Sequence, residues 1–167
     1  MSEKPNFEML VERHSRELFA YLWRLLGDEA EAEDCLQDVY LRAYKAYARL
    51  DDNANTRAWL YRIATNCAYT QLKKRSRIDG RSAEFIEGLA SRAPSVDAQV
   101  EQGAQLAQVY RAVMSLPHKQ RAALMLRKYQ ELDYEQIARA LDCSPESARA
   151  NVYQALKKLR VGLAEEV

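Results

Sequence analysis

The sequence predicts an all-α protein of two small helical domains joined by a flexible linker, with a helix-turn-helix in the second domain. Three observations predict this fold class. Hydrophobic residues make up 48% of the 167 residues and charged residues 29%, which favours ordered globular structure over disorder. Only five Gly and four Pro interrupt the chain. The apolar residues recur at three- and four-residue steps, the spacing of amphipathic helices.

The first helix belongs to a domain that we expect to span residues 1–77. Apolar residues recur with helical spacing from Phe7 to Leu25. Gly27 can end this helix because glycine readily adopts the left-handed conformation of a C-terminal cap.

The second and third helices complete the first domain. Asp28 and Glu31 have the spacing of a capping box, which predicts a second helix that runs to about Leu50. Asn55 or Thr56 can cap a third helix. Its apolar stripe is expected to consist of Leu60, Ile63, Ala64, Cys67, Ala68 and Leu72.

A linker is predicted over residues 78–100, where helical periodicity fades and two Gly, one Pro and three Ser occur. The second domain is expected over residues 101–167. Within it, Pro117 suits the first turn of a helix, because its missing N–H would have no partner there.

A helix-turn-helix is predicted near the end of the chain. Asp133 and Gln136 can cap a short helix, and Ser144 with Pro145 can start a longer one. A short helix, a tight turn and a longer helix make up this motif.

The charges are unevenly distributed, although the formal net charge is only +1. Residues 25–41 hold six acidic residues and no Lys or Arg, whereas residues 57–81 hold seven basic residues and one Asp. The first segment can dock a basic partner and the second a polyanion.

Several classes of site are not indicated. Cys35, Cys67 and Cys143 are odd in number and lack CxxC spacing, which favours reduced core thiols over a disulfide framework or a metal site. His14 and His118 fit structural positions, and no glycine-rich phosphate loop occurs. We therefore expect no cofactor and no enzymatic activity. With neither a signal peptide nor an apolar run of about 20 residues, we expect a cytoplasmic protein without membrane insertion.

The exposed side of the last helix could read the major groove of DNA. Arg, Asn and Gln side chains make bidentate contacts to base edges, and Ser144 at the helix N-terminus could hold a phosphate. A solvated basic face is the alternative. The candidates are Ser144, Arg149, Asn151, Tyr153, Gln154 and Lys157.

The outer face of the third helix combines aromatic, amide and cationic groups: Trp59, Arg62, Asn66, Tyr69 or Thr70, and Lys73. This mixture suits single-stranded or melted DNA, because bases stack on rings while cations hold the backbone. The alternative for Trp59 is a place in the core.

On the second helix, Asp34, Gln37 and Asp38 lie at i, i+3 and i+4 and so form one acidic and amide patch. Such a patch can receive Arg and Lys side chains from a partner. Alternatively, the acids favour the helix dipole and Asp38 pairs with Arg42.

Three segments together resemble the extracytoplasmic-function sigma factors of bacterial RNA polymerase. They are AEDCLQDVYLRAYKAY, then TRAWLYRIATNCAYTQLKKRSR, and after the linker LPHKQRAALMLRKYQELDYEQIARALDCSPESARANVYQALKKLR. The motifs occur in the family's order and spacing. The resemblance implies that the chain binds core polymerase and promoter DNA and directs transcription initiation.

The resemblance also implies roles for the candidate residues. Asp34, Gln37 and Asp38 become the patch that docks on the largest polymerase subunits. The last helix reads the minus-thirty-five element, and an anti-sigma factor is a possible further partner. The implied minus-ten site consists of Lys73 and of residues around a flipped base. The latter are Leu50, Asp51, Asp52, Asn53, Ala54, Asn55, Trp59, Arg62 and Asn66.

Two other functions compete with this interpretation. A stand-alone helix-turn-helix transcriptional regulator explains the second domain but leaves the acidic patch and the third helix without a role. A helical scaffold that binds only protein would be favoured if the last helix bound no DNA.

Overall fold

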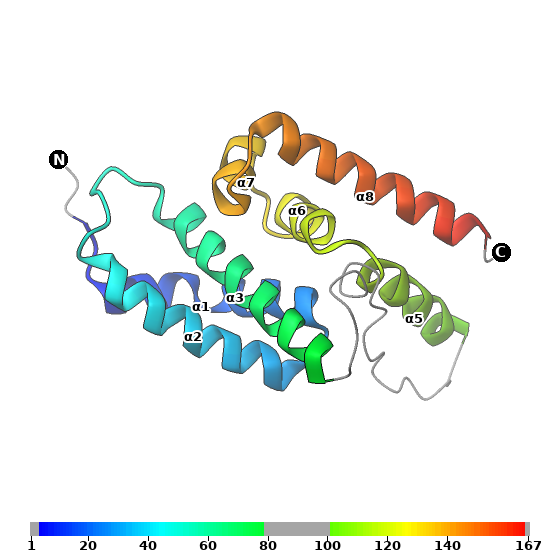
Figure 1. The fold of residues 1–167 in the computed structure, drawn as a ribbon, viewed down its shortest axis with the longest axis horizontal. Coiled ribbons are helices and arrows are strands. Elements are labelled where there is room, and N and C mark those ends of the chain that lie inside the picture. The colour runs from blue at the N-terminus through cyan, green and yellow to red at the C-terminus, as the bar shows by residue number, and fades with distance from the viewer. Residues whose placement is uncertain (1–3, 79–100, 166–167) are drawn as a thin grey trace.

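The computed structural model describes residues 4–78 and 101–165, which form seven helices and no strands (Figure 1). The predicted all-α class is confirmed. Apart from Ile78, the predicted linker lies outside the described residues. The helices are α1 (Phe7–Leu26), α2 (Glu29–Tyr47), α3 (Thr56–Ile78), α5 (Glu101–Met114), α6 (His118–Lys128), α7 (Tyr134–Leu141) and α8 (Pro145–Glu165).

Helices α1 and α2 form an antiparallel pair, and α3 packs against both (Figure 1). Gly27 ends α1 in the left-handed conformation, with φ of 70°, and its N–H donates to the carbonyl of Trp23 at 2.7 Å. The Asp28 carboxylate accepts from the N–H of Glu31 at 3.0 Å and caps α2. Local signals at the turn therefore fix where the two helices meet.

Helix α2 differs from the prediction at both ends. It ends at Tyr47 rather than near Leu50, because the Tyr47 carbonyl accepts from the N–H of Leu50 at 3.1 Å and from the Lys4 ammonium, which draws the chain into a turn. The predicted capping box forms only in half, since the Glu31 carboxylate pairs with the guanidinium of Arg75 instead.

The helix-turn-helix is confirmed in α7 and α8. Both hydrogen bonds of the capping box between Asp133 and Gln136 are present, at 2.8 and 3.1 Å. Asp142 ends α7 with φ of 54°, a conformation that Asp tolerates better than most residues. The Ser144 hydroxyl accepts from the N–H of Ser147 at 3.1 Å and caps α8.

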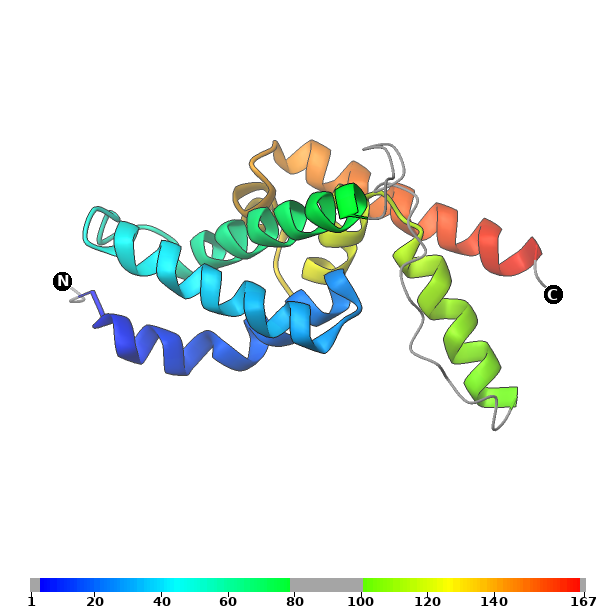
Figure 2. The same ribbon diagram turned by 60° about the horizontal axis from the view of Figure 1, so that its bottom comes forward.

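The two predicted domains pack against each other. Helix α3 packs on α7 and α1 on α6, so the buried side chains of both halves form one continuous core. Figure 2 shows α5 projecting away from this body. We refer to the packing of α3 on α7 and of α1 on α6 as the closed arrangement. The sequence predicted two cores joined by a linker and did not predict this contact.

Candidate nucleic-acid interface

The acidic patch on α2 is exposed as predicted. Asp34, Gln37 and Asp38 face solvent because Cys35 and Val39, which alternate with them, are buried in the core. The alternative pairing of Asp38 with Arg42 does not occur, and neither acid is ion-paired in the part of the chain that the structure describes. The patch is thus available to cations from a partner.

The loop between α2 and α3 is shaped by two of the candidate residues. The Asp51 carboxylate accepts from the N–H of Asn53 at 3.0 Å, and the Asn55 side chain accepts from the N–H of Ala58 at 3.0 Å as the cap of α3. These bonds hold the turn, while the side chains of Asp52 and Asn53 remain exposed. The loop is therefore an ordered, polar rim at the start of α3.

Trp59 is partly buried, so it belongs neither wholly to the core nor wholly to the exposed face of α3. It is partly buried against the core, and its ring centroid lies 6.1 Å from that of Tyr47. Leu50, also partly buried, packs against the same core. Trp59 is therefore anchored on one side and accessible on the other.

The outer face of α3 is in contact with the second domain. The Arg62 guanidinium lies 3.3 Å from the carboxylate of Asp142, in the turn between α7 and α8. Tyr69 stacks on the ring of His118 at 4.9 Å and lies under the ammonium of Lys73 at 4.4 Å. Asn66, which lies between Arg62 and Tyr69 in the sequence, is exposed. The closed arrangement thus occupies part of the face that was predicted to bind melted DNA.

The predicted recognition face of α8 is open. Arg149, Tyr153, Gln154 and Lys157 are exposed, and Asn151 is half-buried. The hydroxyl of Ser144 is used as the cap of α8 but keeps its hydrogen for a phosphate. The side chains from Arg149 to Lys157 lie along one helix, as the base-contacting side chains of a recognition helix do.

Gln130, which no sequence motif indicated, is a hub between the domains. Its side-chain N–H groups donate to the hydroxyl of Tyr61 and, at 3.0 Å, to the carbonyl of Glu17. Its amide oxygen accepts from Arg24 at 3.2 Å, and its backbone carbonyl accepts from Arg57 at 2.8 Å. Gln130 is only 6% exposed. It therefore ties α1 and α3 to the segment between α6 and α7.

Glu17 and Arg57 support this hub from the first domain. The Arg57 guanidinium donates to the Glu17 carboxylate at 2.9 Å, and His14 contacts the same oxygen at 3.2 Å. Burial alone would raise the pKa of Glu17, but the hydrogen bonds to His14 and Arg57 outweigh it and lower the pKa to about 2. Glu17 is thus ionised throughout the physiological range.

His118 and Arg121 are two buried basic side chains of α6, of which His118 is neutral at physiological pH. Burial, together with the charge of Arg121, lowers the pKa of His118 to about 3, and neither ring nitrogen has a hydrogen-bond partner. Arg121 is fully buried and donates to the Met114 carbonyl at 3.0 Å. Burial and the neighbouring Arg75 lower the pKa of Arg121 to about 10.

The three cysteines are free, as predicted. Cys35 and Cys67 are buried, and burial raises the pKa of Cys35 to about 12 and also raises that of Cys67. Burial raises the pKa of Cys143 as well. Thiolates, the reactive form, are therefore scarce at neutral pH.

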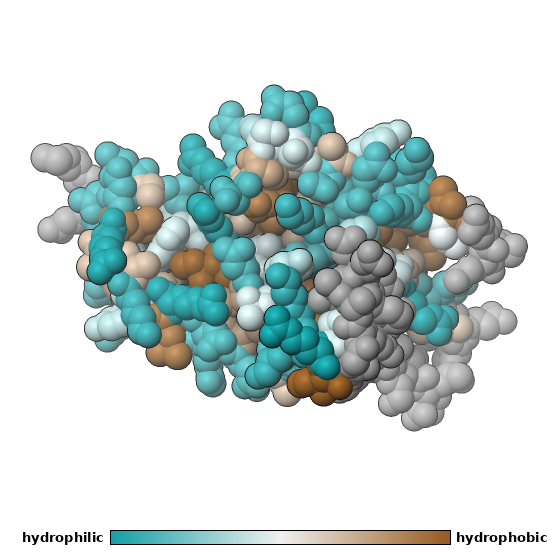
Figure 3. All heavy atoms as spheres, viewed as in Figure 1, coloured by the Kyte–Doolittle hydropathy of each residue, from teal (hydrophilic) through white to brown (hydrophobic). Residues whose placement is uncertain are grey.

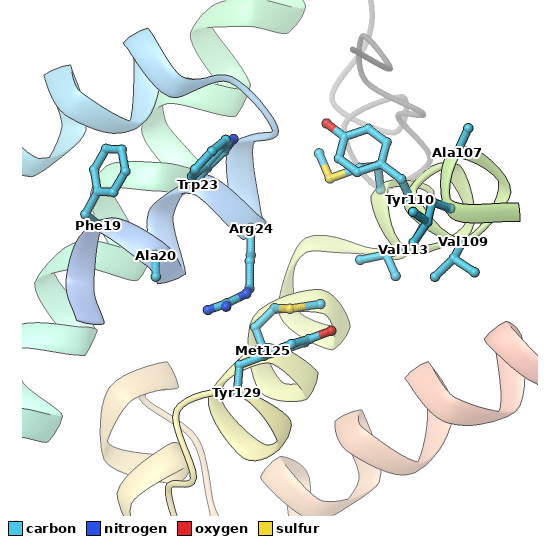
Figure 4. A pocket seen from close by; sticks show the side chains of 12 residues that line it. Phe19, Ala20, Trp23, Arg24, Ala107, Val109, Tyr110, Val113, Met125 and Tyr129 are labelled. Carbon is cyan, nitrogen blue, oxygen red and sulfur yellow. The ribbon is translucent and has the colours of Figure 1, made fainter. Parts of the chain in front are cut away.

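An apolar groove of about 660 Å³ lies between α1, α5 and α6. Figure 4 shows Phe19 and Trp23 on one side of it and Val109 across from them. Leu106, 70% exposed, also lines it. In the closed arrangement Leu106 and Val109 therefore face this groove from α5. Figure 3 shows that hydrophilic residues cover most of the described surface on the side of the molecule seen in Figure 1.

Among the described residues that line the groove, Arg24 is the one with a charged side chain. Its guanidinium lies 4.2 Å from the ring centroid of Tyr129 and donates to Gln130. Within residues 4–78 and 101–165 it has no carboxylate partner. A ligand of this groove would need an apolar face with a negative group near Arg24.

The described residues hold no cluster of three or more His, Cys, Asp or Glu side chains that could bind a metal ion. None of the described helices is long and apolar enough to cross a membrane.

Two family models match the chain. Sigma-70 region 2 matches residues 10–78, and Sigma-70 region 4 matches residues 106–159. The RNA polymerase sigma-H factor of Pseudomonas aeruginosa is 30% identical over 164 residues, covering 92% of this chain and 83% of that protein. The ECF RNA polymerase sigma-E factor of Escherichia coli is 30% identical over 161 residues, covering 92% of this chain and 84% of that protein.

Two solved structures share the fold. One is the sigma factor RpoE in complex with the anti-sigma factor NepR from Bartonella quintana, with 25% identity and a TM-score of 0.72 over 95% of this chain and 96% of that one. The other is CnrH in complex with the cytosolic domain of CnrY, with 22% identity and a TM-score of 0.68 over 96% of this chain and 89% of that one. At this identity the second likeness concerns the fold alone.

Proposed function

The chain belongs to the extracytoplasmic-function family of RNA polymerase sigma factors, and from this premise we propose that the described surfaces direct transcription initiation. The observation that carries the proposal is the exposed, unpaired patch of Asp34, Gln37 and Asp38 on the same chain as a complete helix-turn-helix. A stand-alone regulator needs only the second feature. A polymerase subunit needs both, because it must bind the enzyme and the promoter together.

Core polymerase docks on the acidic patch. Asp34 and Asp38 are exposed and lie one turn apart on α2, and Gln37 adds an amide between them. Carboxylates in this arrangement form charge-assisted hydrogen bonds with Arg and Lys side chains of a partner. The first domain, residues 1–77, is then held against the enzyme with the outer face of α3 turned to the DNA.

The minus-ten element is read by the loop and the outer face of α3. The rim of Asp52 and Asn53 and the anchored ring of Trp59 border a surface on which an extruded base can stack, while Asn66 offers both a donor and an acceptor. Flipping a base costs a few kcal/mol, and a surface that is already ordered offsets this cost.

The minus-thirty-five element is read by α8 of the second domain, residues 101–167. Arg149, Gln154 and Lys157 are exposed along the helix and can reach base edges and phosphates in the major groove. The N-terminus of α8 favours a phosphate near Ser144.

The closed arrangement must open for both elements to be read together. The elements are about 25 base pairs apart, which is about 85 Å at ~3.4 Å per base pair. In the closed arrangement α3 packs directly on α7, which a single turn joins to α8, and packed helices lie only about 10 Å apart. Binding to polymerase therefore exchanges the contacts of Gln130, Arg62 and Tyr69 for contacts with the enzyme and the DNA.

An anti-sigma factor is the partner that we propose for the groove between α1, α5 and α6. The groove is apolar, carries Arg24 without a carboxylate, and exists only while α1 and α6 are packed together. An amphipathic helix with one acidic residue matches this chemistry and would favour the closed arrangement. The solved relative from Bartonella quintana, a complex with an anti-sigma factor, supports a partner of this kind.

The chain acts in this scheme by binding rather than by catalysis, in the cytoplasm where polymerase and promoters are found. The test is transcription from fragmented genomic DNA by sigma-free bacterial core polymerase, with and without the protein, followed by mapping of RNA starts. Discrete starts that depend on the protein and share two upstream elements are expected. No new starts from a folded protein and an active core would favour a stand-alone regulator or a protein-binding scaffold.

A further inference from the structure

Tyr134, the first residue of α7, contacts two guanidinium groups from the neighbouring helices. The Cζ atom of Arg127, near the end of α6, lies 4.5 Å from the centroid of the ring, and that of Arg149 in α8 lies 4.9 Å from it. A guanidinium within about 6 Å of an aromatic centroid is attracted to the electron-rich face of the ring. Figure 1 shows α6, α7 and the start of α8 next to one another.

The ring of Tyr134 is held in place by its own surroundings. The capping box of Asp133 and Gln136 fixes the backbone at the start of α7, and the ring packs partly against the core. The Arg127 guanidinium also donates to the carbonyl of Leu132 at 3.2 Å, in the segment that leads into α7. Tyr134 is therefore a rigid platform rather than a loose surface side chain.

Arg149, by contrast, depends on this ring for its orientation. Its side chain is exposed, and among the described residues its guanidinium makes no hydrogen bond and no ion pair. A free Arg side chain samples many rotamers, and its rotamer entropy is lost when the guanidinium is fixed. A bidentate contact to a guanine requires one orientation of the guanidinium plane. The ring of Tyr134 restricts the orientation of the Arg149 guanidinium plane before DNA binds.

We propose that Tyr134 is a positioning residue that holds Arg149 for base reading in the minus-thirty-five element. This inference rests on the proposed function, because it assumes that α8 lies in the major groove. The ring itself need not touch DNA. It acts through the guanidinium of Arg149, so that losing the ring weakens the selectivity for the base that Arg149 reads and leaves the other positions of the element unchanged.

The test compares two substitutions of different chemistry. Tyr134→Phe keeps the aromatic face, whereas Tyr134→Leu keeps apolar bulk but removes the attraction to the guanidinium. Each variant is assembled with core polymerase and transcribes a promoter library that is randomised in the upstream element, and base preferences are read from the transcripts. Thermal unfolding of each variant checks the fold, and Tyr134→Met replaces Tyr134→Leu if the latter does not fold.

The expected result is specific to one position of the element. Tyr134→Phe keeps the wild-type preference. Tyr134→Leu lowers the preference about two- to fivefold, the range of a cation–π contact at an exposed site, only where Arg149→Ala also lowers it. In the Arg149→Ala background, Tyr134→Leu has no further effect on selectivity, because the group that it positions is gone.

Three results would overturn the inference: wild-type preference in Tyr134→Leu, an equal loss in Tyr134→Phe, or an undiminished effect of Tyr134→Leu in the Arg149→Ala background. The last would show that the residue acts through packing. Wild-type protein that gives no protein-dependent transcripts would overturn the proposed function and this inference with it. Active wild-type protein with any of the three results overturns the inference alone.

Discussion

The guanidinium of Arg62 and the carboxylate of Asp142 lie 3.3 Å apart and join α3 to the turn of the helix-turn-helix. Arg62 belongs to the face that we propose for the minus-ten element, and Asp142 to the motif that we propose for the minus-thirty-five element. One ion pair therefore connects two surfaces that must separate by tens of ångströms on a promoter. The closed arrangement competes with promoter binding through contacts of this kind.

Asp142→Asn is expected to weaken the closed arrangement without disturbing the turn. Asn tolerates the left-handed conformation that Asp142 adopts at φ of 54°. Both side chains are about half exposed or more, and such pairs contribute about 0–1 kcal/mol, so the open population should rise at most about fivefold. Pulsed electron resonance between labels at Lys45→Cys and Lys158→Cys measures the separation of the domains. An unchanged distance distribution would contradict a role for this pair.

Gln130→Leu should open the protein more strongly. It removes the hydrogen bonds to Tyr61, Glu17 and Arg24, and it leaves the buried hydroxyl of Tyr61 without this partner in the closed arrangement only. Unsatisfied buried groups cost about 1–3 kcal/mol, which predicts about a 5- to 150-fold shift toward the open form. The same labels report the distance, and titration with core polymerase should show a correspondingly higher affinity.

The matched control for this prediction is Gln105→Leu. Gln105 is exposed on α5, so the same chemical change there should leave the distance distribution and the polymerase affinity at wild-type values. If Gln130→Leu behaved like this control, Gln130 would not hold the domains together.

Acidification is expected to open the protein through His118. In the closed arrangement burial and the charges of Arg121 and Lys119 lower its pKa to about 3, and the ring stacks on Tyr69 of α3. Once open, His118 returns toward its ordinary pKa of about 6.5. Between these values the open form binds more protons, so the stability of the closed form is complete above pH ~6.5 and falls below it. From pH 7.5 to 5.5 the equilibrium should shift by at most about tenfold, because Arg121 and Lys119 stay beside His118 in the open form.

His118→Phe isolates this effect, because it keeps a ring against Tyr69 and removes the titration. The interdomain distance should then be independent of pH over this range. The ion pair of Glu17 and Arg57 does not contribute here, since both residues belong to the first domain and Glu17 has a pKa of about 2. Equal pH dependence in wild type and His118→Phe would assign the effect to another group.

Local signals in the sequence predicted the helix boundaries at Gly27, Asp28 and Ser144, whereas contacts between distant segments were missed, including the one with Lys4 that accompanies the early end of α2. Gly27, Asp28 and Ser144 act on backbone groups within four residues of themselves, so their roles can be read from spacing alone. Gln130 binds Tyr61 across 69 positions of the chain, and no periodicity encodes such a contact.

For the candidate surfaces too, local features could be predicted from the sequence and long-range ones could not. The exposure of Asp34 and Asp38 follows from the helical period that buries Cys35 between them. The exposure of Leu106 could not be predicted in this way, because an apolar stripe does not tell whether a neighbouring helix covers it. That depends on where α5 lies relative to α1, which is a property of the whole fold.

Asp34→Lys combined with Asp38→Lys should abolish binding to core polymerase and leave the fold intact. Both residues are exposed and neither caps α2, so the reversal turns an attractive surface into a repulsive one without removing a structural bond. Glu8→Lys with Glu12→Lys is the matched control, with the same charge change and spacing on α1. Binding is measured by titration with labelled polymerase, and wild-type affinity of the α2 variant would remove the site assignment.

Asn66→Ala is expected to spare polymerase binding and impair promoter opening. Asn66 is exposed on α3, and the Thr70 hydroxyl donates to its backbone carbonyl at 3.0 Å. Its side chain makes no hydrogen bond to the described residues, so the substitution removes no structural side-chain hydrogen bond. The loss of an amide that holds an extruded base should cost about 1–3 kcal/mol, or about 5- to 150-fold in open complex. Permanganate reactivity of unpaired thymines measures this population. A promoter with a mismatched, already open minus-ten segment should restore most of the activity, because base flipping is then no longer required. Normal opening by Asn66→Ala on duplex DNA would show that the outer face of α3 does not hold the base.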